Sequence, residues 1–328
     1  MMQKKGHVPV PVNRVMVNLM GLAAFLVLIP VFLPWSLAVD ILIYSIAALA
    51  FGLLLGQAGM LSFGQSAFFA LGAYAAGWCL REFQISAIPA LIVAALVGAA
   101  AAATVALLTA RLRDVYFILM TLAFAQMIYF LALTWRTVTG GPSGLSGFAR
   151  PVLSFGVLDV RLDTPMSFYI FTAAVLVVVF ILFYTLVLSP VGLVLRGIKD
   201  NADRLEAVGY PVWRYRLFVF TVSGALTGIA GALSAFQWQI VPVSKASMNE
   251  SANIVFMSIL GGVTAPLGPV AGTTVYIVLS DIVSTYWARW PILFGAFIIA
   301  IVFFLRGGII QGVSLIFSAL GRLVLRRA

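Results

Sequence analysis

One arrangement in the sequence has the spacing of a catalytic nucleophile. Gly141-Pro142-Ser143-Gly144 matches a glycine-x-serine-glycine turn, in which a serine could attack a peptide bond. Such a serine needs a base within hydrogen-bond reach. The only histidine, His7, precedes the first apolar run, and the topology predicted from the charges places it on the opposite side of the membrane. The two side chains cannot meet, so we interpret residues 141–144 as a flexible outward loop.

Other catalytic and energy-coupling residues are missing. The chain has no Gly-Lys dipeptide and therefore no Walker A phosphate loop, so any ATP must bind another subunit. The apolar runs are nearly free of charge, and Asp40 and Asp281 lie near predicted outer ends. This disfavours a proton- or ion-coupled carrier, which needs charged relays inside the bundle. Cys79 is the only cysteine and is expected to be a buried, inert thiol. The sequence thus predicts no enzyme, no metal site and no cofactor bound by this chain.

Uncharged polar residues gather instead where the apolar runs are broken. Residues 56–64 (GQAGMLSFG) and 261–272 (GGVTAPLGPVAG) combine glycine, proline and polar side chains at membrane depth. Non-helical backbone survives there only when it is buried in protein or lines a wet cavity, and such segments often build transporter sites. Packing of small residues between helices is the alternative. The candidate residues for a translocation path are Gln57, Gly59, Ser62, Gly64, Gln65, Gly261, Gly262 and Gly268.

The elements that must carry these residues are membrane-spanning helices. Hydrophobic residues make up 63% of the 328 and charged residues 9%, which is more apolar surface than a soluble fold could bury. The runs do not alternate as the strands of a membrane barrel do. We predict an all-α polytopic bundle with Gly/Pro-broken helices, because the apolar runs have the roughly 17 to 25 residues that a spanning helix needs. Ten spans are expected, at about 15–34, 37–56, 64–80, 87–110, 115–134, 167–188, 217–240, 251–263, 268–287 and 290–305.

The charges orient this bundle in the membrane. The net charge of +10 comes from basic residues at the ends of apolar runs, not from one stripe that would fit a nucleic acid. The positive-inside rule then places both termini in the cytoplasm, with a tail at 1–14, the permease domain at 15–305 and an amphipathic tail at 306–328. Fourteen of the twenty basic residues fall on the cytoplasmic side: Lys4, Lys5, Arg14, Arg111, Arg113, Arg196, Lys199, Arg204, Arg214, Arg216, Arg306, Arg322, Arg326 and Arg327.

The longest inward loop, at about 189–216, has the signals of a short capped helix. Asp200 is the predicted N-cap, with Asp203 three residues later as a weak capping box. Gly209 suits the position after the helix, and Pro211 blocks its continuation. A short helix at this face could be only a turn between two spans. It could also be a docking element that passes the movement of a partner ATPase into the spans.

Five separated motifs resemble, in one order, the M-type permease subunit of branched-chain amino-acid ABC importers. The resemblance covers about 37–310 and lies in 52–74 (GLLLGQAGMLSFGQSAFFALGAY), 113–125 (RDVYFILMTLAFA), 139–145 (TGGPSGL), 189–209 (SPVGLVLRGIKDNADRLEAVG) and 260–272 (LGGVTAPLGPVAG). Residues 196–209 correspond to the ATPase-contacting loop of that family. The matching positions are Arg196, Asp200, Asn201, Glu206, Ala207 and Gly209.

The resemblance implies a transport subunit in the bacterial inner membrane that forms half of a path for branched-chain or related amino acids. Its implied partners are a second homologous permease subunit, two cytoplasmic ABC ATPase subunits that bind the ATP, an external or periplasmic substrate-binding protein, and the lipid bilayer. The alternative function is a standalone secondary carrier or channel for small polar solutes.

Overall fold

Helices make up nearly all of the chain that the computed structural model describes, which is residues 12–109, 112, 114–154 and 159–286 with the isolated positions 292, 295 and 296. In chain order the helices are α1 (Val12–Phe32), α2 (Trp35–Gly52), the π-helix η1 (Leu53–Gln57), α3 (Gln65–Phe83), α4 (Ala87–Thr109), α5 (Asp114–Thr134), α6 (Arg136–Thr139), the 3-10 helix η2 (Gly141–Ser143), α7 (Pro165–Leu188), α8 (Pro190–Ala207), α9 (Val212–Trp238), the 3-10 helix η3 (Val243–Ala246), α10 (Met248–Gly261) and α11 (Gly268–Tyr286). The strands are β1 (Leu145–Ser146), β2 (Val152–Ser154), β3 (Asp159–Arg161) and β4 (Ile240–Val241), paired antiparallel as β1 with β4 and β2 with β3.

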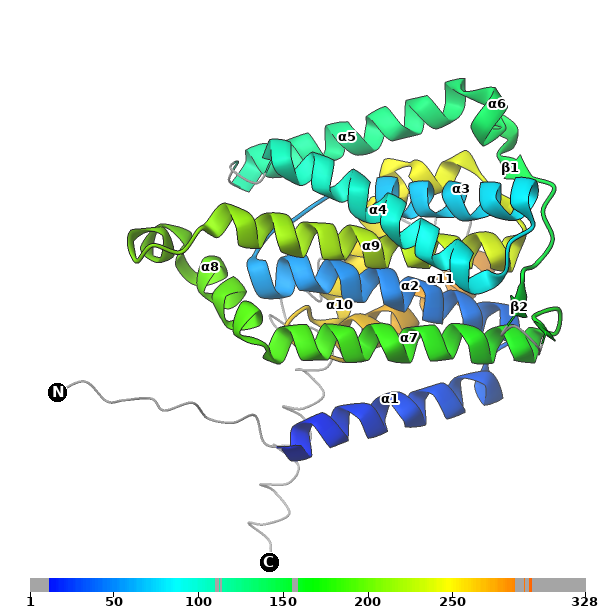
Figure 1. Cartoon of the computed structure of the whole chain (residues 1–328). Helices are drawn as coiled ribbons and strands as arrows, with labels where there is room; N and C mark the ends of the chain where they lie inside the picture. The colour runs from blue at the N-terminus through cyan, green and yellow to red at the C-terminus, as the bar shows by residue number, and fades with distance from the viewer. Residues whose placement is uncertain are drawn as a thin grey trace, which may run out of the picture.

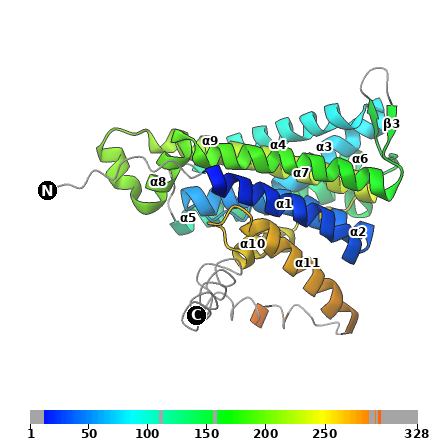
Figure 2. The same ribbon diagram turned by 90° about the horizontal axis from the view of Figure 1, so that it is seen from below.

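The long helices lie side by side in one bundle with two distinct ends (Figure 1). We call the end that carries α6 and the short strands the strand end, and the opposite end, beyond which α8 projects, the α8 end (Figures 1 and 2). Helix α2 lies at the centre, where 83% of its apolar window is buried, whereas α1 lies outside with 11% of its window buried. The exposed apolar face of α1 is therefore one that lipid must cover.

Six described helices are long and apolar enough to cross a membrane: Val15–Phe32, Trp35–Gln57, Ala87–Thr109, Val115–Thr134, Pro165–Leu188 and Val212–Trp238. They confirm the all-α polytopic bundle. The predicted spans at 64–80, 251–263 and 268–287 are helical as α3, α10 and α11. The predicted span at 290–305 falls almost wholly outside the described residues, as do 1–11 and 306–328, so the count of ten stays a prediction. Helix α1 begins at Val12, before the predicted end of the N-terminal tail at residue 14.

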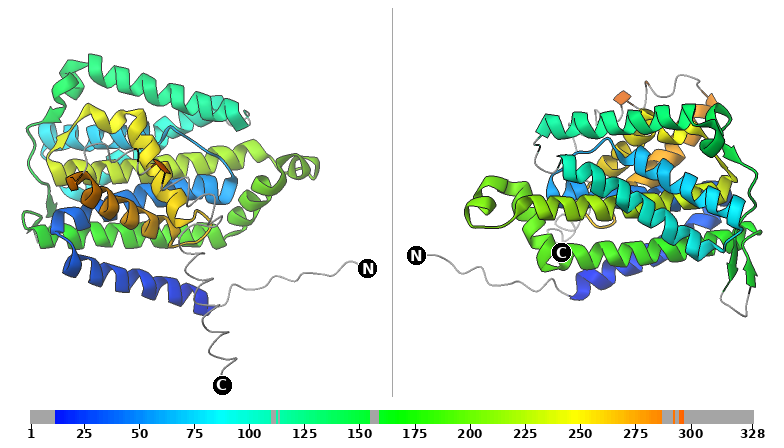
Figure 3. Two further views of the ribbon diagram at one scale, coloured as in Figure 1. Left: turned by 180° about the vertical axis from the view of Figure 1, so that it is seen from behind. Right: turned by 45° about the horizontal axis from the view of Figure 1, so that its top comes forward.

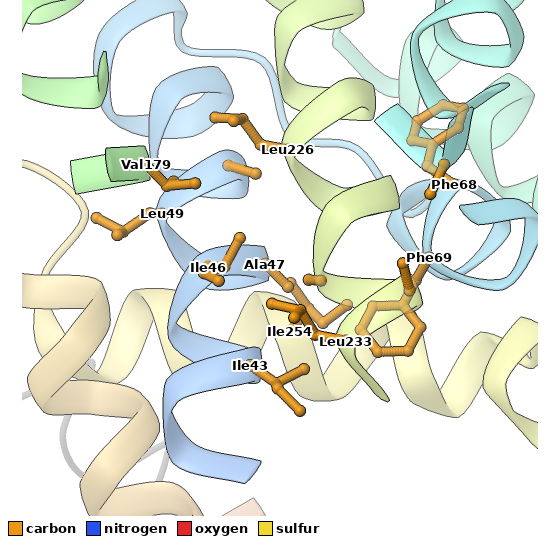
Figure 4. Close-up of a cluster of buried hydrophobic side chains, with 14 of the residues drawn as sticks. Ile43, Ile46, Ala47, Leu49, Phe68, Phe69, Val179, Leu226, Leu233 and Ile254 are labelled. Atoms are coloured by element: carbon orange, nitrogen blue, oxygen red, sulfur yellow. The ribbon is translucent and has the colours of Figure 1, made fainter. Parts of the chain in front are cut away.

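The centre of the bundle is packed through aromatic side chains and small residues. Phe68 and Phe69 of α3 lie beside α9 (Figure 4). The Phe68 ring meets Phe220 of α9 edge-on at 5.4 Å, and the Phe69 ring stacks on Tyr44 of α2 at 5.8 Å. Helix α9 approaches its neighbours through glycines, because a Cβ added at Gly228 would lie 2.5 Å from the Ala94 carbonyl oxygen. Such close backbone contact is how helices associate where lipid removes the hydrophobic driving force.

Serine and proline mark the break between α7 and α8. The Ser189 hydroxyl accepts a hydrogen bond from the Gly192 amide at 3.3 Å, and Pro190 occupies the first helical position. A proline there lacks only an amide hydrogen that would have had no partner, whereas it prevents α7 from continuing. The chain therefore ends α7 at Leu188 and starts a new, more polar helix at the α8 end.

Helix α3 begins inside the protein, with Gln65 and Ser66 buried, whereas α10 begins at an exposed Met248 and turns inward at Glu250 and Ser251. The Ser66 amide donates to the Ser251 hydroxyl at 2.9 Å, and the Ser251 hydroxyl donates to the Phe63 carbonyl oxygen at 2.7 Å. Helices α10 and α11 pack on α2 at the rear of the bundle (Figure 3). The buried start of α3 is therefore joined to the first turns of α10 by the Ser251 hydroxyl.

Candidate functional site

Helix α8 consists of two parts that meet at Asn201. Its backbone there is extended (φ −165°, ψ 99°), and its side-chain oxygen accepts a hydrogen bond from the Arg204 amide at 2.9 Å. Asn201 therefore caps the second part of the helix, and the prediction that Asp200 is the cap is wrong by one residue. Asp200 belongs to the first part of α8 and has helical backbone angles, whereas an N-cap residue has non-helical angles.

The end of α8 matches the prediction closely. Gly209 has φ +93°, its amide donates to the Glu206 carbonyl oxygen at 2.9 Å, and the Tyr210 amide donates to the Leu205 carbonyl oxygen at 3.1 Å. This pair of bonds is a Schellman motif, which satisfies the last carbonyls of a helix and requires a left-handed residue. The second part of α8 is thus a short rod closed at both ends.

The predicted coupling residues divide into two groups. Five of them are exposed on the segment 200–210, which we call the projecting part of α8 and which includes the turn after the helix: Asp200, Asn201, Glu206, Ala207 and Gly209. Exposed apolar side chains lie beside them, at Val208, Tyr210 and Trp213. Arg196 is different, because its guanidinium turns toward the bundle.

Arg196 and Lys199 join α8 to the first broken segment. The Arg196 guanidinium Nη1 donates to the Gln57 side-chain oxygen at 3.2 Å and to the Val187 carbonyl oxygen at 2.9 Å. The Lys199 ammonium donates to the Gly56 carbonyl oxygen at 3.0 Å. Gln57 and Gly56 both belong to the π-helix η1, whereas Val187 lies at the end of α7. Two cationic side chains of α8 are therefore hydrogen-bonded to the π-helix that follows α2.

The two broken segments touch each other at the α8 end. A Cβ added at Gly56 would lie 2.2 Å from the Val263 carbonyl oxygen, so only glycine allows this approach. In the second segment Gly262 has φ +100°, and Gly261 packs against the backbone of Gly268. Gly59 has φ +69° and lines a pocket of about 280 Å³ with Lys199 and Arg216. The prediction of non-helical backbone is confirmed at 59–64 and 262–267, whereas Gly56 lies in the π-helix η1, Gly261 ends α10 and Gly268 begins α11.

The other polar residues of the first segment are buried and hydrogen-bonded. Gln65 donates to the Ser223 hydroxyl at 3.2 Å and accepts from the Thr227 hydroxyl at 2.7 Å. The Ser62 hydroxyl accepts from the Gly64 amide at 3.1 Å. The Gln65 contacts join α3 to α9, as the packing alternative predicts, while the Ser62 contact is local to the segment. A path-lining role for the eight candidate residues stays a prediction.

The Gly141-Pro142-Ser143-Gly144 loop is folded, not flexible as expected. Gly144 donates to the Gly141 carbonyl oxygen at 2.9 Å, and Leu145 pairs with Val241 in the β1–β4 ladder. The loop therefore fixes the segment that returns from α9 toward α10. His7 lies outside the described residues.

That returning segment carries a charged cluster that the sequence analysis missed. The Lys245 ammonium donates to the Tyr44 hydroxyl at 2.5 Å and lies 3.2 Å from a Glu250 carboxylate oxygen, and the Tyr44 hydroxyl donates to the same oxygen. Asp40, one turn before Tyr44 on α2, accepts from the Trp238 indole at 3.1 Å. Glu250 is 8% exposed in the first turn of α10, just before the span predicted at 251–263, so the bundle holds a buried charge outside the predicted runs. The signal available was Asp40 and Tyr44 at helical spacing in an apolar run.

Comparison with known proteins connects this geometry to a family. The family model described as branched-chain amino acid transport system / permease component matches residues 33–305. The chain is similar to the high-affinity branched-chain amino acid transport system permease protein LivM of Salmonella typhimurium, with 27% identity over 271 residues, 76% of this chain and 64% of the relative. The protein of the same name from Escherichia coli is 27% identical over 265 residues, 75% of this chain and 62% of the relative.

A shorter similarity reaches the probable branched-chain amino acid transport permease protein LivH of Methanocaldococcus jannaschii, with 29% identity over 120 residues, 37% of this chain and 38% of the relative. The chain thus spans 64% and 62% of the length of the two bacterial LivM relatives. No solved structure matches it significantly. The apolar helices make the chain a multi-pass membrane protein, and the match over residues 33–305 shows that it belongs to the family of branched-chain amino acid transport system permease components.

Proposed function

We propose that this chain is the M-type permease subunit of an ATP-driven importer of branched-chain or related amino acids in the bacterial inner membrane. It works with a second homologous permease subunit, two cytoplasmic ABC ATPases and an external substrate-binding protein. The chain itself catalyses no reaction and binds no cofactor, since ATP binds the partner subunits. The observation that carries this proposal is the capped, projecting α8 tied to the broken end of α2 by Arg196 and Lys199.

The projecting part of α8 is the ATPase-docking surface. Its exposed residues combine charge with apolar side chains, as docking surfaces between subunits do. Asp200, Asn201, Glu206, Ala207 and Gly209 lie on this surface, while Arg196 passes the movement of α8 to Gln57. The two caps matter because a frayed helix would absorb the movement instead of transmitting it.

The α8 end then lies in the cytoplasm and the strand end outside. With ten spans both termini are cytoplasmic and the permease domain covers 15–305; the amphipathic tail predicted at 306–328 lies outside the described residues. The broken segments, with Gln57, Ser62 and Gln65, border the path when the permease opens toward the cytoplasm. Uncharged amides and hydroxyls can bind a passing zwitterion without the several-kcal/mol cost of a buried charge.

Leucine uptake into vesicles tests the proposal. We expect uptake by the assembled complex to require both ATP and the external binding protein, and Glu206→Lys to abolish it at normal membrane levels. Glu82→Lys is the matched control, because Glu82 is an exposed glutamate at the end of α3 far from α8. Full uptake by Glu206→Lys would refute the docking role. Uptake by the chain alone without ATP would instead indicate a secondary carrier or channel.

A further inference from the structure

A pocket of about 430 Å³ lies toward the strand end of the bundle, away from the broken segments. Helices α2 and α11, the end of α9 and the segment that leads to α10 enclose it. Its volume falls in the range of small-molecule sites, roughly 300 to 1,000 Å³. Asp40, Tyr44 and Lys245 supply its polar groups, and Trp238, Ile240 and Ile277 supply apolar walls.

The charges favour a pocket that faces water or another subunit rather than lipid. Asp40, Lys245 and Glu250 lie within or beside a bundle whose outer helices must contact hydrocarbon, and charged side chains at that depth face protein or a water-filled cavity. Asp40 and Tyr44 lie four residues apart on α2 and so share one face of that helix. The pocket therefore opens on the side of α2 that faces water or another subunit.

The Lys245 ammonium is fixed by two hydrogen bonds and has one donor left for a ligand. An ammonium has three donors, and two of them bind Tyr44 and the carboxylate of Glu250. The rings of Tyr44 and Phe69 also lie 5.1 and 5.9 Å from the nitrogen. The remaining donor can bind a carboxylate that enters the pocket. Because Glu250 already shares the charge, such a carboxylate is bound weakly, as a transient station in a transport path requires.

Asp40 supplies the opposite charge. Its carboxylate accepts one hydrogen bond, from Trp238, and within the described part of the chain it forms no ion pair. The sum of Asp40, Lys245 and Glu250 is one negative charge, so a ligand that brings an ammonium group to Asp40 is favoured. Between the two charges, the apolar walls can cover an aliphatic side chain and remove it from water.

We propose that this pocket is the outer binding station for the transported amino acid, with the α-ammonium at Asp40, the α-carboxylate at Lys245 and an aliphatic side chain against Trp238, Ile240 and Ile277. The proposal rests on the function proposed above and adds the place and the recognition chemistry. Asp40 is then a specificity-determining residue, because it separates zwitterions from carboxylic acids that lack the ammonium.

Protection of a single cysteine in the assembled complex tests the site directly. Ile277→Cys in a Cys79→Ala background is treated with a small water-soluble thiol reagent in the presence of L-leucine, 3-methylbutylamine or 4-methylpentanoate. L-Leucine carries both charges, whereas each of the other probes carries one. We expect L-leucine to slow labelling at least tenfold, the amine to act only at concentrations at least tenfold higher, and the acid to have no effect.

Charge variants sharpen the assignment. Asp40→Asn should raise the leucine concentration needed for protection at least tenfold, and Asp40→Glu should restore part of the affinity. Asp281→Asn on α11 is the matched control, since Asp281 is exposed and does not line the pocket. The labelling experiment on Ile277→Cys keeps Asp40 intact, so it still tests the pocket if a variant of Asp40 fails to fold.

The outcomes separate this proposal from the function it rests on. A complex that transports leucine while leucine leaves Ile277→Cys labelling unchanged overturns the pocket and keeps the permease function. Equal protection by all three probes also overturns it, because the pocket is then a general apolar cleft. A wild-type complex that transports no amino acid refutes the proposed function itself.

Discussion

The hydrogen bond between Arg196 and Gln57 joins the side chain of an α8 residue to the end of α2. Replacing Arg196 with Met keeps the length and apolar packing of the side chain but removes its bonds to Gln57 and to the Val187 carbonyl oxygen. Gln57→Met removes only the first bond. Arg214→Met is the control, because Arg214 is exposed near the start of α9 and its guanidinium lies over the ring of Trp213.

The size of the effect follows from burial. A hydrogen bond from a charged donor contributes about 1.5 to 3 kcal/mol, and a buried acceptor left without a partner adds its own desolvation cost. Gln57 is 5% exposed, so water does not replace the guanidinium. The pair is therefore expected to show a coupling free energy of roughly 1.5 to 3 kcal/mol, which is a ten- to hundredfold factor in the population of docked α8.

The assay is the number of leucine molecules imported per ATP hydrolysed by the assembled complex in proteoliposomes. We expect ATP hydrolysis to continue in Arg196→Met while import per ATP falls at least tenfold. The double variant should be no worse than Arg196→Met, because the bond to Gln57 is already lost. Purely additive losses, or normal stoichiometry in Arg196→Met at an unchanged thermal unfolding temperature, would show that α8 does not act through Gln57.

Three further predictions concern α8, the topology and the broken segment. Gly209→Val should reduce uptake more than Gly209→Ala, because at φ +93° a β-branched residue is strained although nothing lies within 4 Å of the added Cβ; equal uptake by both variants contradicts this. A reporter fused after Arg161 should be external and one fused after Asn201 cytoplasmic, and both on one face would overturn the ten-span topology. Cysteine at Ser62 or Gln65, with no other cysteine present, should change its labelling by a water-soluble thiol reagent when ATP is supplied; protection in every nucleotide state would mean dry packing.

Local signals predicted the ends of helices well. The Ser189-Pro190 break and the glycine at 209 act through contacts within a few residues, so the sequence contains everything that decides them. The start of the second part of α8 was missed by one residue because Asp200 and Asn201 are both good caps. The choice between them depends on how far the first part of α8 continues, and its packing through Leu195 and Ile198 against the bundle decides that.

Contacts between distant segments could not be predicted in this way. Gln57 was recognised as polar at membrane depth, but its partner lies 139 residues later in the chain. Lys245 lies between the predicted spans 217–240 and 251–263, and its partner Tyr44 is 201 residues earlier in the chain. A single sequence gives the polarity of each side chain, and only the tertiary arrangement decides whether two of them form a buried pair.

Helix α10 connects the two proposed sites mechanically. Near its C-terminal end, Val263 contacts Gly56, whose carbonyl oxygen accepts the hydrogen bond from Lys199 of α8. In its first turn Glu250 binds Lys245, which the β1–β4 ladder holds on a different element. A helix of 14 residues is a rod of about 21 Å, and packed helices shift by about 1 to 2 Å in switching transitions. A shift of this size at the α8 end would move Glu250 relative to Lys245, and we expect it to change the affinity of the proposed pocket for a substrate carboxylate.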